Sequence, residues 1–423
     1  MAASASEKDM NQPMYPAPGR FFIILILGAL STVSPLAIDM YLPAFSQIAA
    51  GMHTSVAKIS LSVSSYFIGL AAGQLIYGPL LDRFGRKKPL YVGMVLFIVM
   101  SVACMLARTK EALIILRLFQ ALSGCVAWVA AMAMSRDFFP VKESAKILSL
   151  LILIIGVSPM FAPTIGSFIS VYLGWQWVFA VLAIVVSVLL GVVFFWLPEG
   201  HRPDASISLE PLPIIQDFLY ILKNRQFHTF ALAGSFAFAG VLVYVAGSPI
   251  IFMGSFHVTQ QVYGYIFAGL SVGFIGSNQV NILLLRKFTS AQIFHGAILL
   301  ECATSIVFLV GTYYGWFGLP ATLAMLFVLL CSLGLTYPNA AALALAPFDK
   351  NIGSASALLG FLQIGPAALT SASVGLFNTS DIMPVLAIFA ATAWTALAIF
   401  SWGKKHLPAQ DRVPVNETAT AAH

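Results

Sequence analysis

Two ionisable side chains stand alone within long apolar stretches of the chain. Asp39 is the one charged residue in positions 21–57. Arg117 is the one charged residue in positions 112–135. In apolar surroundings a carboxyl group can bind and release a proton, and a nearby cation makes the proton easier to lose. The pair therefore has the chemistry of a proton-binding site whose affinity depends on the distance between the two groups.

The composition places these residues in a membrane. Of 423 residues, 59% are hydrophobic and 9% are charged, whereas soluble domains carry about 25% charged residues. This excludes a soluble globular enzyme and a disordered chain. The four cysteines lie in apolar stretches without C-x-x-C spacing, so neither a metal cage nor a disulfide framework is indicated.

The uncharged stretches predict twelve membrane-spanning helices, since one span needs about 20 mostly apolar residues. Four stretches fit a single helix and four fit a pair joined by a turn. The single spans lie in residues 21–57, 59–81, 89–107 and 112–135, and the pairs in 147–198, 226–285, 288–348 and 351–403. The turns of the four pairs are expected at 173–177, 253–261, 313–320 and 377–383.

The basic residues orient these spans. With the N-terminus inside, every Lys and Arg is cytoplasmic except Lys58, Arg108, Lys110 and Arg117. This asymmetry is the positive-inside pattern of membrane proteins. The formal charge of +6 is therefore a topology signal, and nucleic acid is not an expected partner.

The longest polar interruption, residues 199–225, divides the spans into two sets of six. Apolar residues at helical spacing in 214–223 predict a short amphipathic helix on the inner surface; the alternative is that span seven starts early.

Gly and Pro recur in spans five and eleven, about 210 residues apart, as in transporters with internal repeats. We thus expect an all-α membrane protein of two pseudo-symmetric halves. Its predicted parts are a cytoplasmic tail (1–20), two six-helix bundles (21–198 and 227–403), a cytoplasmic central loop (199–226) and a second cytoplasmic tail (404–423).

The most specific motif is GPLLDRFGRKK at residues 78–88, between spans two and three. It resembles the signature loop of the major facilitator superfamily, G-x-x-x-D-R-x-G-R-[RK]-[RK], at every position. An ordinary positive loop requires neither Asp82 nor two glycines, which permit tight turns and close helix approach. The resemblance implies that Asp82 latches the halves together near the start of span eleven. The cytoplasmic gate expected from it consists of Gly78, Asp82, Arg83, Gly85, Arg86 and Arg136.

Three further motifs narrow the resemblance. Leu113-x3-Arg117-x2-Gln120 in span four resembles the motif of proton-coupled members. Residues 38–44 (IDMYLPA) and 136–140 (RDFFP) are similar to the Bcr/CflA family of drug:proton antiporters. The helix-packing motif associated with exporters is resembled in span five by Gly156, Pro159, Pro163 and Gly166.

Asp39 and Arg117 have similar predicted depths, about 8 to 9 Å below the outer surface at 1.5 Å per helical residue. The two charges can therefore meet. We expect Asp39 to carry the proton and Arg117 to adjust its affinity; the alternative is a static salt bridge between spans one and four. Glu301 is the third ionisable residue in an apolar stretch. The resemblance places span nine in the outer ring of helices, so Glu301 is interpreted as structural.

Aromatic and polar residues of the cavity-lining helices are the expected substrate contacts, although each aromatic ring could instead serve helix packing. Such a site suits varied amphiphilic compounds better than sugars, which need several hydrogen-bond partners. The set comprises Tyr41, Phe45, Tyr66, Gln120, Trp128, Phe238, Tyr244, Tyr337, Asn339, Phe361 and Gln363.

These observations predict a proton-driven multidrug exporter of the bacterial inner membrane, multi-pass and with both termini cytoplasmic. The resemblance suggests bicyclomycin-, chloramphenicol- or sulfonamide-like substrates. The alternative is export of an endogenous amino acid, peptide or sugar on the same fold. No catalytic cluster occurs in a loop, so an enzyme is not expected. Neither a cofactor nor a metal is expected, and the partners are amphiphilic drugs, protons and the lipid bilayer, with the carrier acting as a monomer.

Overall fold

The computed structural model describes residues 17–200, 203, 211–348, 352–377 and 381–405. The predicted tails therefore lie mostly outside the described residues. α1 begins at Ala17, earlier than the predicted start at residue 21. Pro18 does not prevent this, because proline is tolerated in the first turn of a helix.

Twelve helices are long and apolar enough to cross a membrane, which confirms the predicted number. The four predicted turns fall where one helix ends and the next begins. The first half comprises α1 (Ala17–Asp39), α2 (Phe45–Gly51), α3 (Val56–Phe84), α4 (Lys87–Met105), α5 (Lys110–Phe138), α6 (Val141–Tyr172) and α7 (Gln176–Trp196). After α8 (Pro211–Leu222), the second half comprises α9 (Arg225–Pro249), α10 (Gln260–Leu284), α11 (Ser290–Tyr313), α12 (Leu319–Leu345), α13 (Ile352–Leu376) and α14 (Met383–Lys405).

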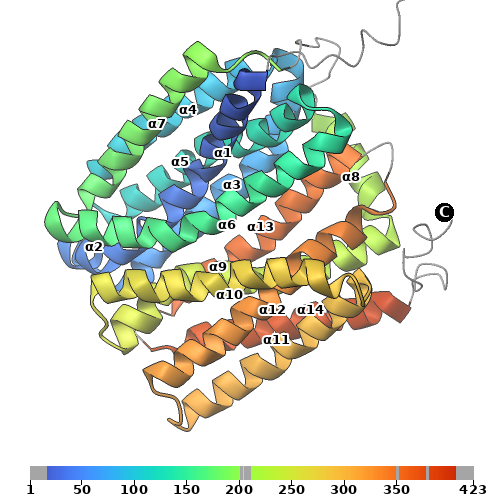
Figure 1. Cartoon of the computed structure of the whole chain (residues 1–423). Coiled ribbons are helices and arrows are strands. Elements are labelled where there is room, and N and C mark those ends of the chain that lie inside the picture. The colour runs from blue at the N-terminus through green and yellow to red at the C-terminus, as the bar shows by residue number, and fades with distance from the viewer. Residues whose placement is uncertain (1–16, 201–202, 204–210, 349–351, 378–380, 406–423) are drawn as a thin grey trace, which may run out of the picture.

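The two halves lie side by side and contact each other mainly through two helix pairs, α3 with α13 and α6 with α10 (Figure 1). We call the end of the bundle that holds Ala17 and Lys405 the terminal face, and the opposite end the distal face. Small residues allow the close approach of α3 and α13. The Ser371 hydroxyl donates to the Ser64 hydroxyl at 3.0 Å. A Cβ on Gly375 would lie 2.5 Å from Leu61 Cγ.

The first helix of each half becomes irregular at the same relative place. α1 ends at Asp39 and is followed by a turn and a 3₁₀ segment, η2 (Leu42–Ala44), before α2. α9 ends at Pro249 and continues as a π-helix, η3 (Ile250–Ser255). A Ser-Pro pair precedes each irregularity, at Ser34-Pro35 and Ser248-Pro249. Proline removes a helical hydrogen bond, and π segments are frequent at functional sites.

α8 is a separate helix in the central loop. Asn224 has extended backbone and caps α9 by accepting a hydrogen bond from the Phe227 amide at 3.0 Å, so span seven does not begin early. Ile221 of α8 is buried against the second half, while Leu219 and Tyr220 are exposed. This is the arrangement of a helix with one face attached to the protein and another free to meet lipid head groups.

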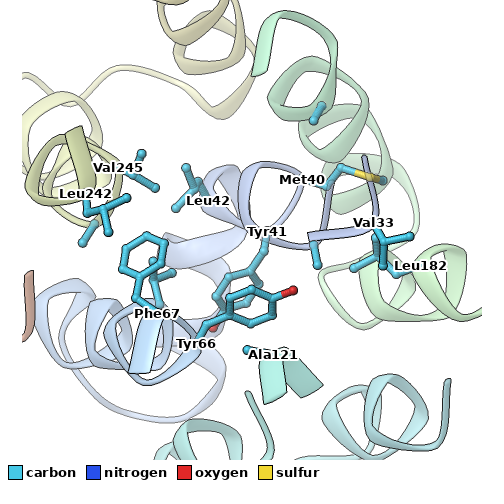
Figure 2. Close-up of a cluster of buried hydrophobic side chains, with 14 of the residues drawn as sticks. Val33, Met40, Tyr41, Leu42, Tyr66, Phe67, Ala121, Leu182, Leu242 and Val245 are labelled. Carbon is cyan, nitrogen blue, oxygen red and sulfur yellow. The ribbon is translucent and has the colours of Figure 1, made fainter. Parts of the chain in front are cut away.

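The apolar core is continuous between the halves. Figure 2 shows Leu42 and Phe67 of the first half facing Leu242 and Val245 of α9. All four side chains are buried. Polar groups near this junction are therefore removed from water on both sides.

Candidate functional site

Arg117 lies in the interior of the first half with its side chain fully buried. Its Nη1 donates to Gln120 Oε1 at 2.6 Å, and its Nη2 donates to the Ala37 carbonyl oxygen at 3.1 Å. The spacing of three residues places Arg117 and Gln120 on the same face of α5. Gln120 in turn donates to the Ser101 hydroxyl at 2.7 Å. The motif in span four therefore forms one buried hydrogen-bonded unit.

Aromatic rings complete the environment of the guanidinium. Its central carbon lies 4.1 Å from the ring centroid of Tyr66, 4.8 Å from that of Tyr41 and 5.8 Å from that of Phe179. A cation over an aromatic face is stabilised, most strongly when both are removed from water. Among the described residues no carboxylate lies within ion-pairing distance of Arg117. The direct contact expected between Asp39 and Arg117 is thus absent from this conformation.

Asp39 lies at the end of α1, shortly before the segment η2 that contacts α9 and α10 of the second half. Its side chain is 4% exposed and forms no hydrogen bond with another described residue. Its carboxyl group interacts electrostatically with the phenol groups of Tyr244 on α9 and Tyr263 on α10. α1 ends at Asp39, and Arg117 donates to the Ala37 carbonyl oxygen two residues earlier, so Arg117 contacts the end of α1 without forming an ion pair with Asp39. Asp39 is therefore a buried carboxyl group at the junction of the two halves.

The predicted substrate contacts separate into two groups. Tyr41, Phe45, Tyr66 and Gln120 are fully buried around Arg117, and the Tyr41 hydroxyl lies 2.9 Å from that of Ser62. Asn339 is buried and donates to Asn281 Oδ1 at 2.7 Å within the second half. Tyr244 and Gln363 are also buried. Substrate contact by these residues stays a prediction.

Four of the predicted aromatic contacts are only partly buried. These are Trp128, Phe238, Tyr337 and Phe361. The rings of Phe238 and Tyr337 lie 4.8 Å apart between centroids, which joins α9 and α12. Their partly exposed faces make them the aromatic groups of the predicted set most available to a ligand.

The signature loop builds an ionic cluster at the terminal face. Arg86 donates through Nε to Asp137 Oδ2 at 2.7 Å and through Nη1 to Asp82. Burial lowers the pKa of the Arg86 guanidinium, but the hydrogen bonds to Asp137 and Asp82 outweigh it, so the pKa lies above its ordinary value. Glu199, just after α7, accepts from the backbone amide of Arg86 at 2.6 Å and from that of Lys87 at 3.2 Å. A carboxylate is favourable there because a helix N-terminus carries partial positive charge.

Two of these acids were not among the predicted gate residues. Asp137 lies within the RDFFP motif at residues 136–140, directly after Arg136. Glu199 could have been found as the acid directly after an apolar span, at the start of the polar central loop. Arg136 itself is exposed, and it is Arg86 that joins the acids. The partner of Asp82 is also Arg86, and its side chain remains 48% exposed. The predicted latch between Asp82 and span eleven is therefore not formed between described residues.

The two glycines of the motif differ. Gly85 has a φ of +83°, and a Cβ there would lie 3.3 Å from Pro203. This is the tight turn expected from the sequence, since glycine adopts positive φ without steric cost. A Cβ on Gly78 would meet nothing within 4 Å, so close helix approach does not explain that glycine. Arg83 lies with its guanidinium carbon 5.9 Å from the ring centroid of Phe84.

Replacing Glu199 with glutamine is expected to loosen the ionic cluster. The amide keeps one oxygen acceptor but loses the charge that interacts with the start of α4, an effect of about 0.3–1 kcal/mol for an exposed group and more when partly buried. We expect a lower melting temperature of the purified protein and faster tryptic cleavage in the central loop. Asp217→Asn, which removes an exposed acid from α8, is the matched control. If Glu199→Gln and Asp217→Asn had equal melting temperatures and equal rates of tryptic cleavage, this role of Glu199 would be contradicted.

The span-five motif packs α6 against two neighbours. A Cβ on Gly166 would lie 2.0 Å from the Met40 carbonyl oxygen, at the irregular segment after Asp39. A Cβ on Gly156 would lie 3.5 Å from Ile275 of α10. Pro163 contributes its carbonyl oxygen, which would lie 3.3 Å from a Cβ on Gly264 of α10. Pro159 lies between them in α6.

Glu301 is buried in α11, 1% exposed, and neither of its carboxyl oxygens has a hydrogen-bond partner among the described residues. It lies on the helix face that packs against α12 and α14 within the second half. A structural role for Glu301 stays a prediction.

Comparison with known proteins decides the family. The Major Facilitator Superfamily matches residues 27–371 of the chain. The chain belongs to the Major Facilitator Superfamily. It is accordingly a transporter, not an enzyme, and a multi-pass membrane protein. The family predicted from the signature loop is confirmed.

Relatives from bacteria extend this result. The chain is 29% identical over 397 residues to the uncharacterized MFS-type transporter YdgK of Bacillus subtilis, covering 92% of the chain and 97% of that protein. It is 28% identical to a bicyclomycin resistance protein homolog of Haemophilus influenzae, with 86% and 92% covered. It is also 28% identical to the multidrug resistance protein MdtL of a Shewanella strain, with 90% and 95% covered.

A solved structure shows the same fold. The D-xylose-proton symporter superposes with a TM-score of 0.73 at 16% sequence identity, covering 90% of this chain and 97% of that chain. At this identity the likeness concerns the arrangement of the helices alone.

Proposed function

We propose that this transporter is a proton-coupled exporter of amphiphilic drugs that works by alternating access, with Asp39 as the proton carrier. The observation that carries the proposal is the position of Asp39, a buried carboxyl group at the junction of the two halves. An ionisable residue within a membrane is expensive and marks ion pathways. The names of the bicyclomycin-resistance and multidrug-resistance relatives support drugs as substrates.

The contacts between the halves support a conformation closed at the distal face. There Gln47 Nε2 donates to Gln260 Oε1 at 3.4 Å, and the Ser46 hydroxyl donates to Met253 Sδ at 3.8 Å. Figure 1 shows α6 and α10 close together towards this end and diverging towards the end that holds the termini. We assign this arrangement to the inward-facing state, with the terminal face in the cytoplasm.

The signature loop supplies the gate of the proposed cycle. In the inward-facing state Asp82 pairs with Arg86 and Arg86 with Asp137, all within the first half. We propose that in the outward-facing state the start of α13 approaches Asp82, because a helix N-terminus attracts a carboxylate. Asp82 thus pairs with Arg86 when the terminal face is open and with the start of α13 when the terminal face is closed.

Arg117 has a supporting role in this proposal. It holds the end of α1 through the Ala37 carbonyl oxygen, two residues before Asp39. Protonation from the outside accompanies drug release, and proton release to the inside resets the carrier. A movement of α1 that brings the Asp39 carboxyl group nearer to Arg117 would lower the proton affinity of Asp39 and so favour this release.

The partly exposed aromatic residues are the proposed drug contacts. Trp128, Phe238, Tyr337 and Phe361 offer flat apolar faces with few fixed polar groups. Such a surface binds diverse amphiphiles better than sugars. We further propose that the carrier acts as a monomer in the inner membrane, with both termini in the cytoplasm, as the basic residues indicate.

Drug-induced proton release tests the function directly. Inside-out membrane vesicles containing the protein are acidified inside, and a pH-sensitive dye follows release when chloramphenicol or a sulfonamide is added. We expect release from these vesicles and none from vesicles that lack the protein. If folded protein gives no release with any drug, drug export is wrong and amino acids, peptides and sugars are the next substrates to screen.

A further inference from the structure

One face of α3 is turned towards the second half. Phe67 lies on this face and is opposite Leu242 and Val245 of α9, where the apolar core joins the two halves (Figure 2). Residues seven apart in a helix lie on the same side of it. Gln74 therefore shares the face of Phe67, and at 1.5 Å per residue it lies about 10 Å nearer to the terminal face.

Gln74 also lies beside α13. A Cβ on Gly360 would lie 3.4 Å from Gln74 Oε1, in the same helix pair that carries the hydrogen bond between Ser371 and Ser64. The Gln74 side chain is partly exposed and forms no hydrogen bond with another described residue. One turn further along α3, a Cβ on Gly78 would meet nothing within 4 Å. On this face of α3, packing against the second half thus extends to Gln74 and is absent at Gly78.

The facing helix α9 carries an aromatic residue at the same level. Phe238 lies seven residues before Val245, so it is on the same side of α9. It is also nearer to the terminal face, because α9 runs from that face to the distal face. The Phe238 ring lies 4.8 Å from that of Tyr337 between centroids, and both residues are partly exposed. Gln74 and this aromatic pair therefore lie at one level on opposite halves.

We propose that Gln74 is a substrate contact of the drug site and that the site selects uncharged amphiphiles with a hydrogen-bonding group such as an amide, a carbonyl or a hydroxyl. This inference rests on the proposed function. The drug lies on the rings of Phe238 and Tyr337 and hydrogen-bonds to the side-chain amide of Gln74, which can both donate and accept. Gly360, having no side chain, leaves room for that amide beside α13.

The acids near this level determine the charge of the substrate. Over their described lengths, α9, α12 and α13 contain no Asp or Glu. The one acid of α3, Asp82, lies eight residues beyond Gln74 and pairs with Arg86, and Asp39 is only 4% exposed. A cation that leaves water needs a charged partner to offset its lost hydration, and aromatic faces supply only part of this. An uncharged drug needs only the hydrogen bond.

Equilibrium binding to the full-length protein in lipid nanodiscs tests this inference. The probes are chloramphenicol, which is uncharged, and the lipophilic cation tetraphenylphosphonium. We expect the native protein to bind chloramphenicol at least about tenfold more tightly, because the cation would lose its hydration without a charged partner. Gln74→Leu should weaken chloramphenicol binding about five- to tenfold, which corresponds to one lost hydrogen bond. Gln216→Leu makes the same change at an exposed position of α8 and should leave the affinity unchanged.

Gln74→Glu keeps the shape of the side chain and supplies the missing charge. At pH 8 we expect this variant to bind tetraphenylphosphonium at least about tenfold more tightly than the native protein does, as close charge pairs at interfaces do. This measurement decides the position of Gln74 even if Gln74→Leu does not fold. An unchanged affinity for tetraphenylphosphonium in Gln74→Glu would place Gln74 outside the drug site.

The outcomes separate this inference from the proposed function. Native affinity for chloramphenicol in folded Gln74→Leu overturns the role of Gln74. Equally tight binding of both probes to the native protein overturns the selection of uncharged drugs. In both cases chloramphenicol still binds, and the proposed function stands. If the native protein does not bind chloramphenicol, this inference is wrong; the proposed function fails with it only if drug-induced proton release, measured separately in vesicles, is also absent.

Discussion

Replacing Asp39 with asparagine is expected to abolish drug-induced proton release, with drug transport against a gradient reduced at least about tenfold. Asparagine has nearly the shape of the protonated carboxyl group but cannot exchange a proton. Its burial at the junction of the halves is otherwise preserved, so drug binding should persist. The measurement is dye-reported proton release from acidified inside-out vesicles, together with equilibrium binding of the same drug to the purified protein.

Glu301→Gln is the matched comparison, because it makes the same change at the second buried acid of the described residues, which lies within the second half. We expect proton release close to that of the native protein. Loss of release in Glu301→Gln with release retained in Asp39→Asn would move the coupling site to α11. Loss of drug binding in Asp39→Asn would instead make Asp39 a substrate contact.

The second large effect is expected at Gly166, where alanine should destabilise the protein markedly. The new Cβ would lie 2.0 Å from the Met40 carbonyl oxygen. That atom belongs to the backbone, so it cannot rotate aside as a flexible side chain would. Overpacking of this kind costs about 1–3 kcal/mol and occasionally more. Since Met40 follows Asp39, we also expect reduced transport by the fraction of protein that folds. Thermal unfolding of the purified protein measures the first effect, and vesicle assays the second.

Gly191→Ala provides the control for this prediction. Gly191 also lies within a spanning helix, α7, but a Cβ there would meet nothing within 4 Å. Alanine has a higher helix propensity than glycine, so Gly191→Ala should unfold at an unchanged or slightly higher temperature. Equal melting temperatures of the two variants would show that α6 can move away from Met40, and the close contact would not be a constraint on the fold.

The sequence predicted the local features of the signature loop, but not its contacts with distant parts of the chain. The signature loop predicted the family and the turn at Gly85, because a glycine-containing motif constrains the backbone wherever it occurs. It did not predict that Glu199 joins the loop, because this contact connects the end of α7 to the start of α4. Contacts between residues far apart in the chain depend on how the helices are packed, which local spacing does not reveal.

The sequence alone determined the twelve spans, since the length of an apolar stretch and the thickness of a membrane are sufficient for that. It also determined which ionisable residues lie inside the membrane. The tertiary structure decided what they contact. Helical rise gives Asp39 and Arg117 a similar depth but fixes neither the rotation of each helix nor where it ends. α1 ends at Asp39, which forms no ion pair with Arg117, and Arg117 remains with Gln120 and the aromatic rings inside the first half.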